Sequence, residues 1–441
     1  MPPRASTPSF ALLVRVFAQI GLTSFGGPAG QIAMMHRVLV DERRWIDETR
    51  YFSALNFCML LPGPEAMQLA TYAGWRLHGV AGGVAAGALF VLPGACVMLA
   101  LSLVYALYGQ VPAVEAVFFG IKAAVLAIVV EALLRVARRA LKGLAEWSTA
   151  AAAFLAIFFF EVPFPVVVMI AALAGLWRGR RQSKDGAAPA TAPASASVAS
   201  VRLHPRQTIA TAGLWLAIWI LPLLLVVAVF GRSHVLSELA WFFSKLAVVT
   251  FGGAYAVLAY MAQDVVEHYH WLAPGEMLDG LGLAETTPGP LILVTQFVGT
   301  LAAYRQGGGM ALAMGLLGAL VTLWATFIPC FLWVFTGAPY LERLTQLPRL
   351  AFALRSVTAC VVGVILNLTV WFALHVLFAN VTDHHFGPLK LTVPNPASVN
   401  GWAVALAALA VVLIFVLHRG IITTMAVCAA ASVVLRWFSL L

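Results

Sequence analysis

Four helix-breaking motifs interrupt apolar sequence and carry the clearest chemistry in this chain. Phe25-Gly26-Gly27, Trp45 and Pro62-Gly63-Pro64 recur as Phe251-Gly252-Gly253, Trp271 and Pro288-Gly289-Pro290, each position displaced by 226 residues. A helix that restarts after such a break presents unpaired N–H groups and the positive end of its dipole, which together form an anion site. Paired interruptions in two halves of a chain are the best sequence indication of a substrate site in a secondary transporter.

We expect the anion to bind between the tips of the four broken helices. Each Pro-Gly-Pro ends one helix and starts the next, and the polar side chains on the turns that follow, Gln68, Thr71, Thr295 and Gln296, can donate hydrogen bonds. The predicted substrate-binding residues at the tips are Gly26, Gly27, Pro62, Gly63, Pro64, Gln68, Gly252, Gly253, Thr287, Pro288, Gly289, Pro290 and Gln296. The structural alternative is that the glycines allow close helix packing and the prolines are hinges.

Ionisable residues inside apolar segments are the second group of predicted functional residues. Lys122 and Arg355 occupy matching places in Gly-Ile-Lys-Ala-Ala-Val and Ala-Leu-Arg-Ser-Val-Thr. We expect them to face each other and to neutralise a bound anion, the alternative being that they reach the membrane interface. Glu65 and Glu285 flank the Pro-Gly-Pro motifs and are predicted proton-coupling residues, although Glu65 could instead be a helix cap. Glu131 and Arg135, spaced i and i+4, are expected to pair.

The composition indicates a membrane protein and argues against several other classes. Hydrophobic residues make up 62% of the 441 and charged residues 10%, against about 25% charged in a soluble domain. The net charge of +9 resides in short loops, which is a topology signal and not a nucleic-acid-binding face. Five single cysteines and the loop pair His384-His385 form no metal motif, so no metal or cofactor is expected. No nucleophile–base pair at membrane depth suggests an enzyme, and no cleavable signal is expected at the N-terminus.

The chain is predicted to be an all-α integral membrane protein with about 10–13 membrane segments, some of them broken or re-entrant. Residues 10–177 form an N-terminal membrane repeat, and residues 236–441 form a C-terminal one. Residues 178–206 are an Ala/Pro-rich basic linker expected in the cytoplasm, and residues 207–230 are a linking transmembrane helix. The expected elements of the first repeat are Phe10–Leu39, Tyr51–Leu77, Val80–Tyr108, Ala113–Ala140, Ser148–Phe160 and Pro163–Trp177. Those of the second are Trp241–Met261, Met277–Ala303, Met310–Thr336, Leu350–Leu377, Trp402–Leu417 and Ile421–Phe438.

Loop charge predicts that the two repeats are inverted relative to each other. The loop after the first broken helix carries Arg37, Arg43, Arg44 and Arg50, whereas Gln263–Gly275, its counterpart, contains no Lys or Arg. Because positively charged loops stay in the cytoplasm, Arg43 is expected inside and Glu267 outside. The unmatched apolar span Ala210–Phe230 supplies the reversal.

The motifs resemble those of the chromate ion transporter family in its long form with two homologous halves. The residues that carry the resemblance are Phe25-Gly26-Gly27-Pro28, Trp45, Leu61-Pro62-Gly63-Pro64, Leu92-Pro93, Phe251-Gly252-Gly253, Trp271, Leu278-Asp279-Gly280-Leu281, Thr287-Pro288-Gly289-Pro290 and Phe327-Ile328-Pro329. The resemblance implies export of chromate across the bacterial inner membrane, driven by the membrane potential or the proton gradient, and chromate resistance. Sulfate or another oxyanion is the alternative substrate, because sulfate shares the shape and charge of chromate. The expected partners are the anion and membrane lipid, and a homodimer is left open.

Overall fold

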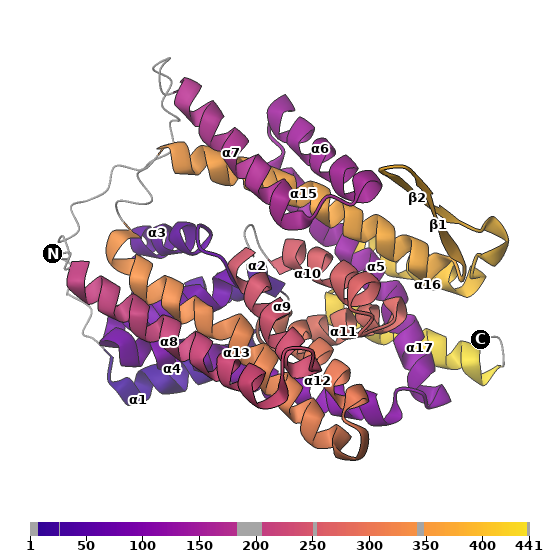
Figure 1. The fold of residues 1–441 in the computed structure, drawn as a ribbon, viewed down its shortest axis with the longest axis horizontal. Coiled ribbons are helices and arrows are strands. Elements are labelled where there is room, and N and C mark those ends of the chain that lie inside the picture. Colours follow the sequence, from indigo (N-terminus) through magenta and orange to yellow (C-terminus); the bar gives the residue numbers. More distant parts are fainter. Residues whose placement is uncertain (1–7, 26, 183–204, 250–253, 342–347, 439–441) are drawn as a thin grey trace.

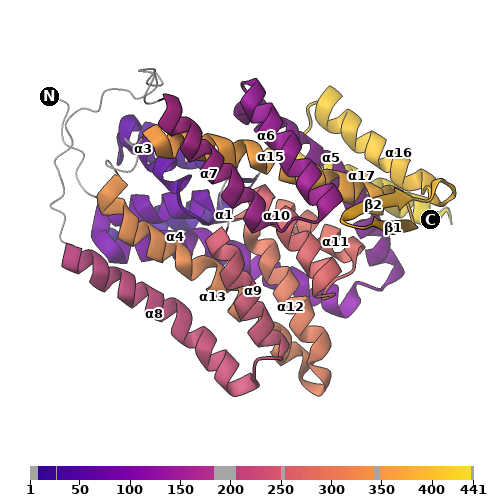
Figure 2. The same ribbon diagram turned by 45° about the horizontal axis from the view of Figure 1, so that its top comes forward.

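The structure is a computed structural model that describes residues 8–25, 27–182, 205–249, 254–341 and 348–438. Within these residues the chain is mostly helical (Figures 1 and 2). Of the predicted substrate-binding residues, Gly26, Gly252 and Gly253 lie outside the described part, as does most of the predicted linker 178–206.

The helices of the first half break where the motifs predict. They are α1 (Phe10–Thr23), α2 (Gly27–His36), the π-helical turn η1 (Arg37–Glu42), α3 (Glu48–Cys58), α4 (Glu65–Tyr108), α5 (Pro112–Ala140), α6 (Leu144–Phe160) and α7 (Phe164–Gln182). Helix α4 begins directly after Pro64, whose backbone is extended. At His78 and Gly79 the backbone angles are non-helical, and the chain folds back on itself, because a Cβ on Gly87 would lie only 2.4 Å from the hydroxyl oxygen of Thr71. The boundary expected between Leu77 and Val80 is therefore present inside α4.

The rest of the chain begins with α8, which has no counterpart in the first half, and then follows the same helix order. Its elements are α8 (Pro205–Phe230), α9 (Val235–Val249), α10 (Ala254–Gln263), η2 (Asp264–His268), α11 (Pro274–Thr286), η3 (Leu291–Leu293), α12 (Val294–Gln306), η4 (Gly308–Met310), α13 (Ala311–Gly337), η5 (Ala338–Tyr340), α15 (Pro348–Leu377), β1 (Val381–Phe386), β2 (Leu389–Pro394), η6 (Pro396–Ser398), α16 (Gly401–Val411), η7 (Val412–Val416) and α17 (Ile421–Trp437). One difference from the first half follows the second Pro-Gly-Pro. A single 3₁₀ turn, η3, separates this motif from α12, whereas α4 starts at once after the first motif.

Several helices are long and apolar enough to cross a membrane, as expected for a multi-pass membrane protein. In the described residues they are Glu65–Tyr108, Pro112–Ala140, Arg206–Phe230, Gly308–Tyr340 and Ala351–Leu377. Shorter apolar helices of 10–17 residues, such as α1 and α6, accompany them. The span in α8 is the least covered, with only 17% of its apolar window buried. Exposed leucines such as Leu221 and Leu225 therefore offer this helix to lipid hydrocarbon.

One element departs from the all-α prediction. The segment between α15 and α16, expected to be a loop, contains the antiparallel hairpin β1–β2, paired from Val381–Pro394 to Phe386–Leu389. The turn is Gly387-Pro388, and Gly387 has a positive φ of 62°, which glycine adopts without strain. The alternation of Leu389, Leu391 and Val393 with polar residues is a strand pattern. His384 and His385 lie exposed on β1.

Each half packs its last two helices against the other half. Helices α6 and α7 of the first half pack along α15, and α16 and α17 of the second half pack along α5. Both views show α6 and α7 lying beside α15 (Figures 1 and 2). The Ser432 hydroxyl on α17 donates to the carbonyl of Ala116 on α5, with an O–O distance of 2.6 Å. The two halves therefore form one interleaved helical body, and α5 and α15 are each covered by helices of the other half.

Candidate functional site

The first helix break contacts the Pro-Gly-Pro turn of the other half. The side-chain amide of Gln31, on α2, donates to the carbonyl oxygen of Gly289, with an N–O distance of 2.5 Å. The backbone N–H of Gly289 donates in turn to the carbonyl of Ser24, at 2.8 Å, between α1 and α2. Gly289 has φ +91°, a conformation that favours glycine. Two tips that are far apart in sequence are thus joined by hydrogen bonds.

Each Pro-Gly-Pro turn also packs against a proline-containing helix of the opposite half. The Pro288 carbonyl approaches Gly94 of α4 so closely that a Cβ there would lie 2.0 Å from its oxygen. In the other half, a Cβ on Gly63 would lie 2.9 Å from Sγ of Cys330 on α13. Gly94 follows Pro93 and Cys330 follows Pro329, so each turn packs beside a helical proline, once through a backbone carbonyl and once against a side chain.

Three of the four predicted tips line one small cavity. Its lining residues are Pro28, Gln31, Pro64, Glu65, Ala66, Pro290, Leu291 and Ile292. The cavity volume is about 10 Å³, close to the minimum that holds one water molecule. The fourth tip, residues 250–253, lies outside the described part of the chain. The structure therefore has its described tips closed together around a space too small for a tetrahedral oxyanion.

The polar side chains at the tips donate hydrogen bonds to the backbone. The side-chain amide of Gln68 donates to the Pro62 carbonyl at 2.7 Å, and that of Gln296 donates to the Ala95 carbonyl at 3.0 Å. The hydroxyl of Thr71 donates to the carbonyl of Met67 on the same helix, and that of Thr295 donates to the carbonyl of Ile292 in the preceding turn η3. Each of these four side chains thus has a donor bound to a backbone oxygen in this structure, and a contact of any of them with an anion stays a prediction. The donors left to face the cavity are the first backbone N–H groups of α4, because the first turn of a helix has no intrahelical acceptor for them.

Acceptor atoms also surround this cavity. Gln31 is 1% exposed, and its side-chain oxygen is buried with no hydrogen-bond partner. Glu65, half-buried at the first position of α4, lines the same cavity. Glu285, the other predicted proton-coupling residue, is buried at 5% exposure on α11 and does not line this cavity. Sequence reasoning missed Gln31, although a glutamine four residues after Gly27 on the restarted helix was a visible signal.

The two predicted cations do not meet. Lys122 on α5 forms an ion pair with Asp279 on α11, with an N–O distance of 3.3 Å. Arg355 is exposed on α15, about 20 residues before His375, which lines the same cavity as Lys122. At about 1.5 Å per helical residue, Arg355 lies roughly 30 Å along α15 from His375, and so from the cavity that Lys122 lines. The matching sequence positions were therefore a wrong guide to the distance between Lys122 and Arg355. The predicted pair of Glu131 and Arg135, in contrast, is present.

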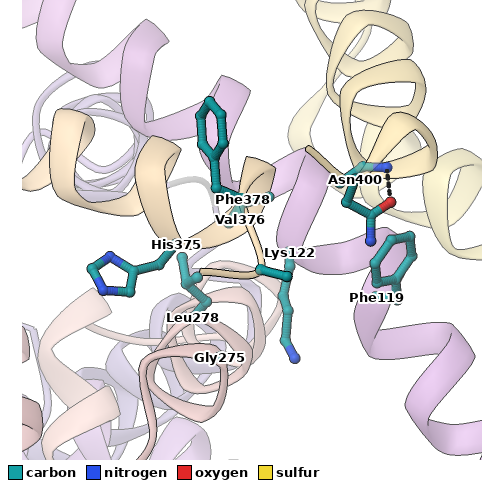
Figure 3. Close-up of a pocket in the computed structure, with 10 residues that line it drawn as sticks. Phe119, Lys122, Gly275, Leu278, His375, Val376, Phe378 and Asn400 are labelled. Atoms are coloured by element: carbon teal, nitrogen blue, oxygen red, sulfur yellow. Dashed lines mark hydrogen bonds between the residues drawn. The ribbon is translucent and has the colours of Figure 1, made fainter. Parts of the chain in front are cut away.

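Lys122 lies at a second, larger cavity of about 200 Å³. The cavity is lined by Phe119, Lys122, Gly275, Leu278, His375, Val376, Phe378, Ala379, Asn400 and Ala403. Figure 3 shows Lys122 extending between the α11 residues and the residues Phe119 and Asn400. Asp279 is 2% exposed and also accepts a hydrogen bond from the Tyr105 hydroxyl at 2.8 Å. Asp279 was visible as an acid within an apolar segment, but its partner lies 157 residues away in sequence.

Comparison with known proteins identifies relatives over most of the chain. The family model described as "Chromate transporter" matches residues 11–176 and 237–433. A chromate transport protein of Pseudomonas aeruginosa is 34% identical over 371 residues, covering 83% of this chain and 80% of the relative. The chromate transport protein of Cupriavidus metallidurans is 30% identical, with 83% and 84% covered. A probable chromate transport protein of Synechococcus elongatus is 29% identical, with 82% and 85% covered. No solved structure matches the chain.

The long apolar helices, the tips that meet between the halves and the two matched regions all lead to the same assignment. The matched regions cover the broken helices of both halves and leave out the segment between them. The resemblance seen in the motifs is thereby confirmed, and the expectation that the chain is not an enzyme is confirmed with it. The chain belongs to the chromate transporter family and is a multi-pass membrane transporter.

Proposed function

We propose that this protein exports chromate across the bacterial inner membrane, driven by the membrane potential or the proton gradient, and so confers chromate resistance. The observation that carries the proposal is the cavity at which the break of the first half meets both Pro-Gly-Pro turns. There the N-terminus of α4 offers backbone N–H groups and the positive end of its dipole to an anion. Named relatives that are chromate transport proteins support chromate as the substrate.

The substrate site of this proposal lies between the tips and opens when they separate. The described state has room for about one water molecule there, so an oxyanion enters only when Gln31 and Gly289 move apart. Irregular backbone at membrane depth needs burial in protein or a wet cavity, and a closed state meets that condition through the cross-half hydrogen bonds. Gly26, Gly27, Gly252 and Gly253 would complete the site, and Glu65 and Glu285 would couple a proton to transport.

An inverted repeat is the second part of the proposal. Glu267, in the loop after the second helix break, lies 3.7 Å from Lys390 of the β hairpin. Figures 1 and 2 show α3, which follows the arginine-rich loop, near one end of α15 and the hairpin near the other. The loop after the first helix break and the loop after the second thus lie toward opposite ends of α15. This placement supports insertion of the two halves in opposite orientations. The arginine-rich loop would be cytoplasmic by the positive-inside rule.

The charge of the substrate favours export. One elementary charge moved through 100 mV changes its free energy by about 2.3 kcal/mol. A dianion leaving a cell with a negative interior therefore gains roughly 4.6 kcal/mol per 100 mV. Uptake of the same dianion would need coupling to cations. Sulfate is the second candidate substrate, because a site built from helix N-termini and cations separates two tetrahedral dianions poorly.

The proposal is tested by expressing the protein in a chromate-sensitive bacterium and measuring growth and radiolabelled chromate retained in the cells. The wild type should raise the tolerated chromate concentration and lower the retained label. Gly289→Leu should abolish both effects while still inserting into the membrane, because φ +91° disfavours a side chain and the tips would no longer close. The matched control is Gly213→Leu on α8, where a Cβ meets nothing within 4 Å. Resistance that survives in a well-expressed Gly289→Leu protein would contradict this location of the site.

A further inference from the structure

We propose that Lys122 forms a second oxyanion subsite in the 200 Å³ cavity, and that Asp279 competes with the anion for the lysine ammonium. This inference rests on the proposed transport of a chromate-like dianion. It concerns a different place from the helix tips. Asp279 lies on α11, nine residues before Pro288 in the sequence, and nine helical residues span about 13 Å. The subsite is therefore a stage before or after the tips on the route of the anion.

The first argument is the size and lining of the cavity. Its volume of about 200 Å³ is several times the roughly 30 Å³ that one water molecule occupies in the liquid, so a tetrahedral oxyanion fits. Asn400 adds a donor, because its side-chain oxygen accepts from the backbone N–H of Ala403 at 3.0 Å and this leaves the amide N–H₂. Figure 3 shows this bond and the amide nitrogen of Asn400 beside Phe119.

The second argument is how Lys122 is held. A lysine ammonium has three donors, and one of them contacts Asp279 at 3.3 Å. The side chain lies close over the backbone, since a Cβ on Gly275 would be 3.1 Å from the ammonium nitrogen. The Lys122 side chain is 27% exposed, whereas that of Asp279 is 3% exposed. Lys122 therefore connects the open cavity to a carboxylate buried behind it, and its remaining donors are available to a ligand.

The third argument is that the buried carboxylate of Asp279 has only part of its hydrogen-bonding capacity satisfied. One carboxylate oxygen accepts from Tyr105 at 2.8 Å and contacts Lys122, while the other is buried with no hydrogen-bond partner. A buried acceptor without a partner is costly, so this pair is not optimised for stability alone. A dianion at Lys122 would repel the Asp279 carboxylate, and Asp279 in turn weakens the anion's hold on Lys122. Such competition keeps binding weak enough for the anion to leave.

The test is equilibrium binding of radiolabelled chromate to the purified full-length protein in lipid nanodiscs, with transport by the same variants in proteoliposomes. Asp279→Asn, which removes the competing charge at nearly constant shape, should lower the dissociation constant about fivefold, the size expected for a partly exposed ion pair. Its maximal transport rate should fall, because release becomes slower. Lys122→Gln should weaken binding, and adding Asp279→Asn to it should change nothing further, since the two residues act as one unit.

Two further variants separate this inference from a structural role. Tyr105→Phe removes the hydroxyl that donates to Asp279 and leaves Lys122 as the sole donor seen at that carboxylate oxygen. The ion pair of Lys122 and Asp279 should therefore tighten, and chromate binding should weaken about twofold. Glu131→Gln is the control, because it breaks the other ion pair on α5, and it should leave binding unchanged. If Asp279→Asn does not fold, Tyr105→Phe decides the question by the direction of its effect.

The outcomes distinguish the two proposals. A wild type that neither binds nor transports chromate overturns the proposed function, and this inference with it. A wild type that transports chromate, while Asp279→Asn binds it with equal or lower affinity, overturns this inference alone. Tyr105→Phe binding as tightly as the wild type, or tighter, overturns it as well.

Discussion

The Gln31 side-chain amide bonds to the backbone carbonyl of Gly289 across 258 residues of sequence, at 2.5 Å. The same amide nitrogen also lies 3.4 Å from the Ser24 carbonyl. Because both neighbours are acceptors, the nitrogen must be the atom that faces them, and this fixes the side-chain orientation. One side chain thereby holds the helix break of one half against the Pro-Gly-Pro turn of the other.

Replacing Gln31 should loosen this closure. Gln31→Leu removes the hydrogen bond and leaves the Gly289 carbonyl buried without it, which should cost on the order of 1 kcal/mol of unfolding free energy. We expect chromate transport to fall at least roughly tenfold, since small misplacements of positioning groups have large effects on rate. The measurement is chromate flux in proteoliposomes. Gln19→Leu, at an exposed position on α1, is the control, and equal flux in both variants would refute a role for Gln31.

Contact between the halves at Gly94 should tolerate no side chain. The Cβ of Gly94→Ala would lie 2.0 Å from the Pro288 carbonyl oxygen, so the backbone of the turn must move. Overpacking of this kind costs about 1–3 kcal/mol. The midpoint of thermal unfolding in detergent should therefore fall, together with transport. Gly213→Ala, where a Cβ has open space, should be neutral or slightly stabilising in its helix. A Gly94→Ala protein as stable as Gly213→Ala would contradict the close approach.

The inverted arrangement predicts opposite sides for two exposed residues. In a Cys96→Ser background, which removes the exposed cysteine, single cysteines would replace Arg43 and His270. A membrane-impermeant thiol reagent applied to whole cells should label position 270 and spare position 43. In everted vesicles the pattern should reverse. Labelling of both positions from the same side would exclude insertion of the halves in opposite orientations.

A buried lysine should tie the β hairpin to both halves. The ammonium of Lys390 lies 3.0 Å from Glu161 after α6 and 3.1 Å from Asp383 on β1. Burial opposes the charged form of Asp383, but hydrogen bonds from Thr392 and Lys390 outweigh it and lower the pKa of Asp383. Burial likewise opposes charge on Lys390, yet Glu161, Glu267 and Asp383 raise its pKa.

These shifts give the hairpin a pH dependence with a definite sign. A lowered folded pKa of Asp383 means that its contribution is present above the ordinary aspartate pKa of about 3.9 and is lost as the pH falls through the folded value. Lys390 contributes below the ordinary lysine pKa of about 10.4 and loses that contribution as the pH rises through its higher folded value.

Lys390→Met should therefore lower the unfolding temperature at neutral pH and flatten its decline towards acid. The cost attributable to Asp383 should be no more than about 1 kcal/mol, because its side chain is 43% exposed. Lys142→Met, at an exposed loop position, is the control for loss of a positive charge. An unfolding temperature that declines with acid as steeply in Lys390→Met as in the wild type would show that the cluster is not a stabilising contact.

Sequence patterns predicted the helix breaks well because their cause is local. Each Pro-Gly-Pro motif removes two backbone donors and fixes φ at both prolines, which disfavours a continuous helix, whereas single prolines such as Pro93 and Pro329 lie inside helices. Helices α1, α3 and α4 have boundaries within a few residues of those expected. The hairpin β1–β2 was missed because its strands lie between helices and were treated as a loop, although their alternating residues were visible. The reversal at His78 and Gly79, which divides α4, was predicted as the boundary between two segments.

Contacts of the predicted site residues depended on partners that local sequence does not reveal. Lys122 was paired with Arg355 by position, whereas the ion-pair partner, Asp279, lies in the other half of the chain. Gln68 and Gln296 were expected to face an anion, and in this structure each has a donor bound to a backbone carbonyl. A polar residue in an apolar segment signals that a partner exists; which partner it finds is decided by how helices of the two halves pack.

Chromate flux in everted membrane vesicles tests the central claim most directly. The lumen of such vesicles corresponds to the outside of the cell, so a lumen-positive potential imposed at equal pH should drive uptake of labelled chromate. At roughly 4.6 kcal/mol per 100 mV for a dianion, the effect should be large, should vanish in vesicles without the protein, and should be competed by sulfate. No protein-dependent uptake under an imposed potential or an imposed pH gradient, or uptake driven only by a lumen-negative potential, would contradict export of an oxyanion by this chain.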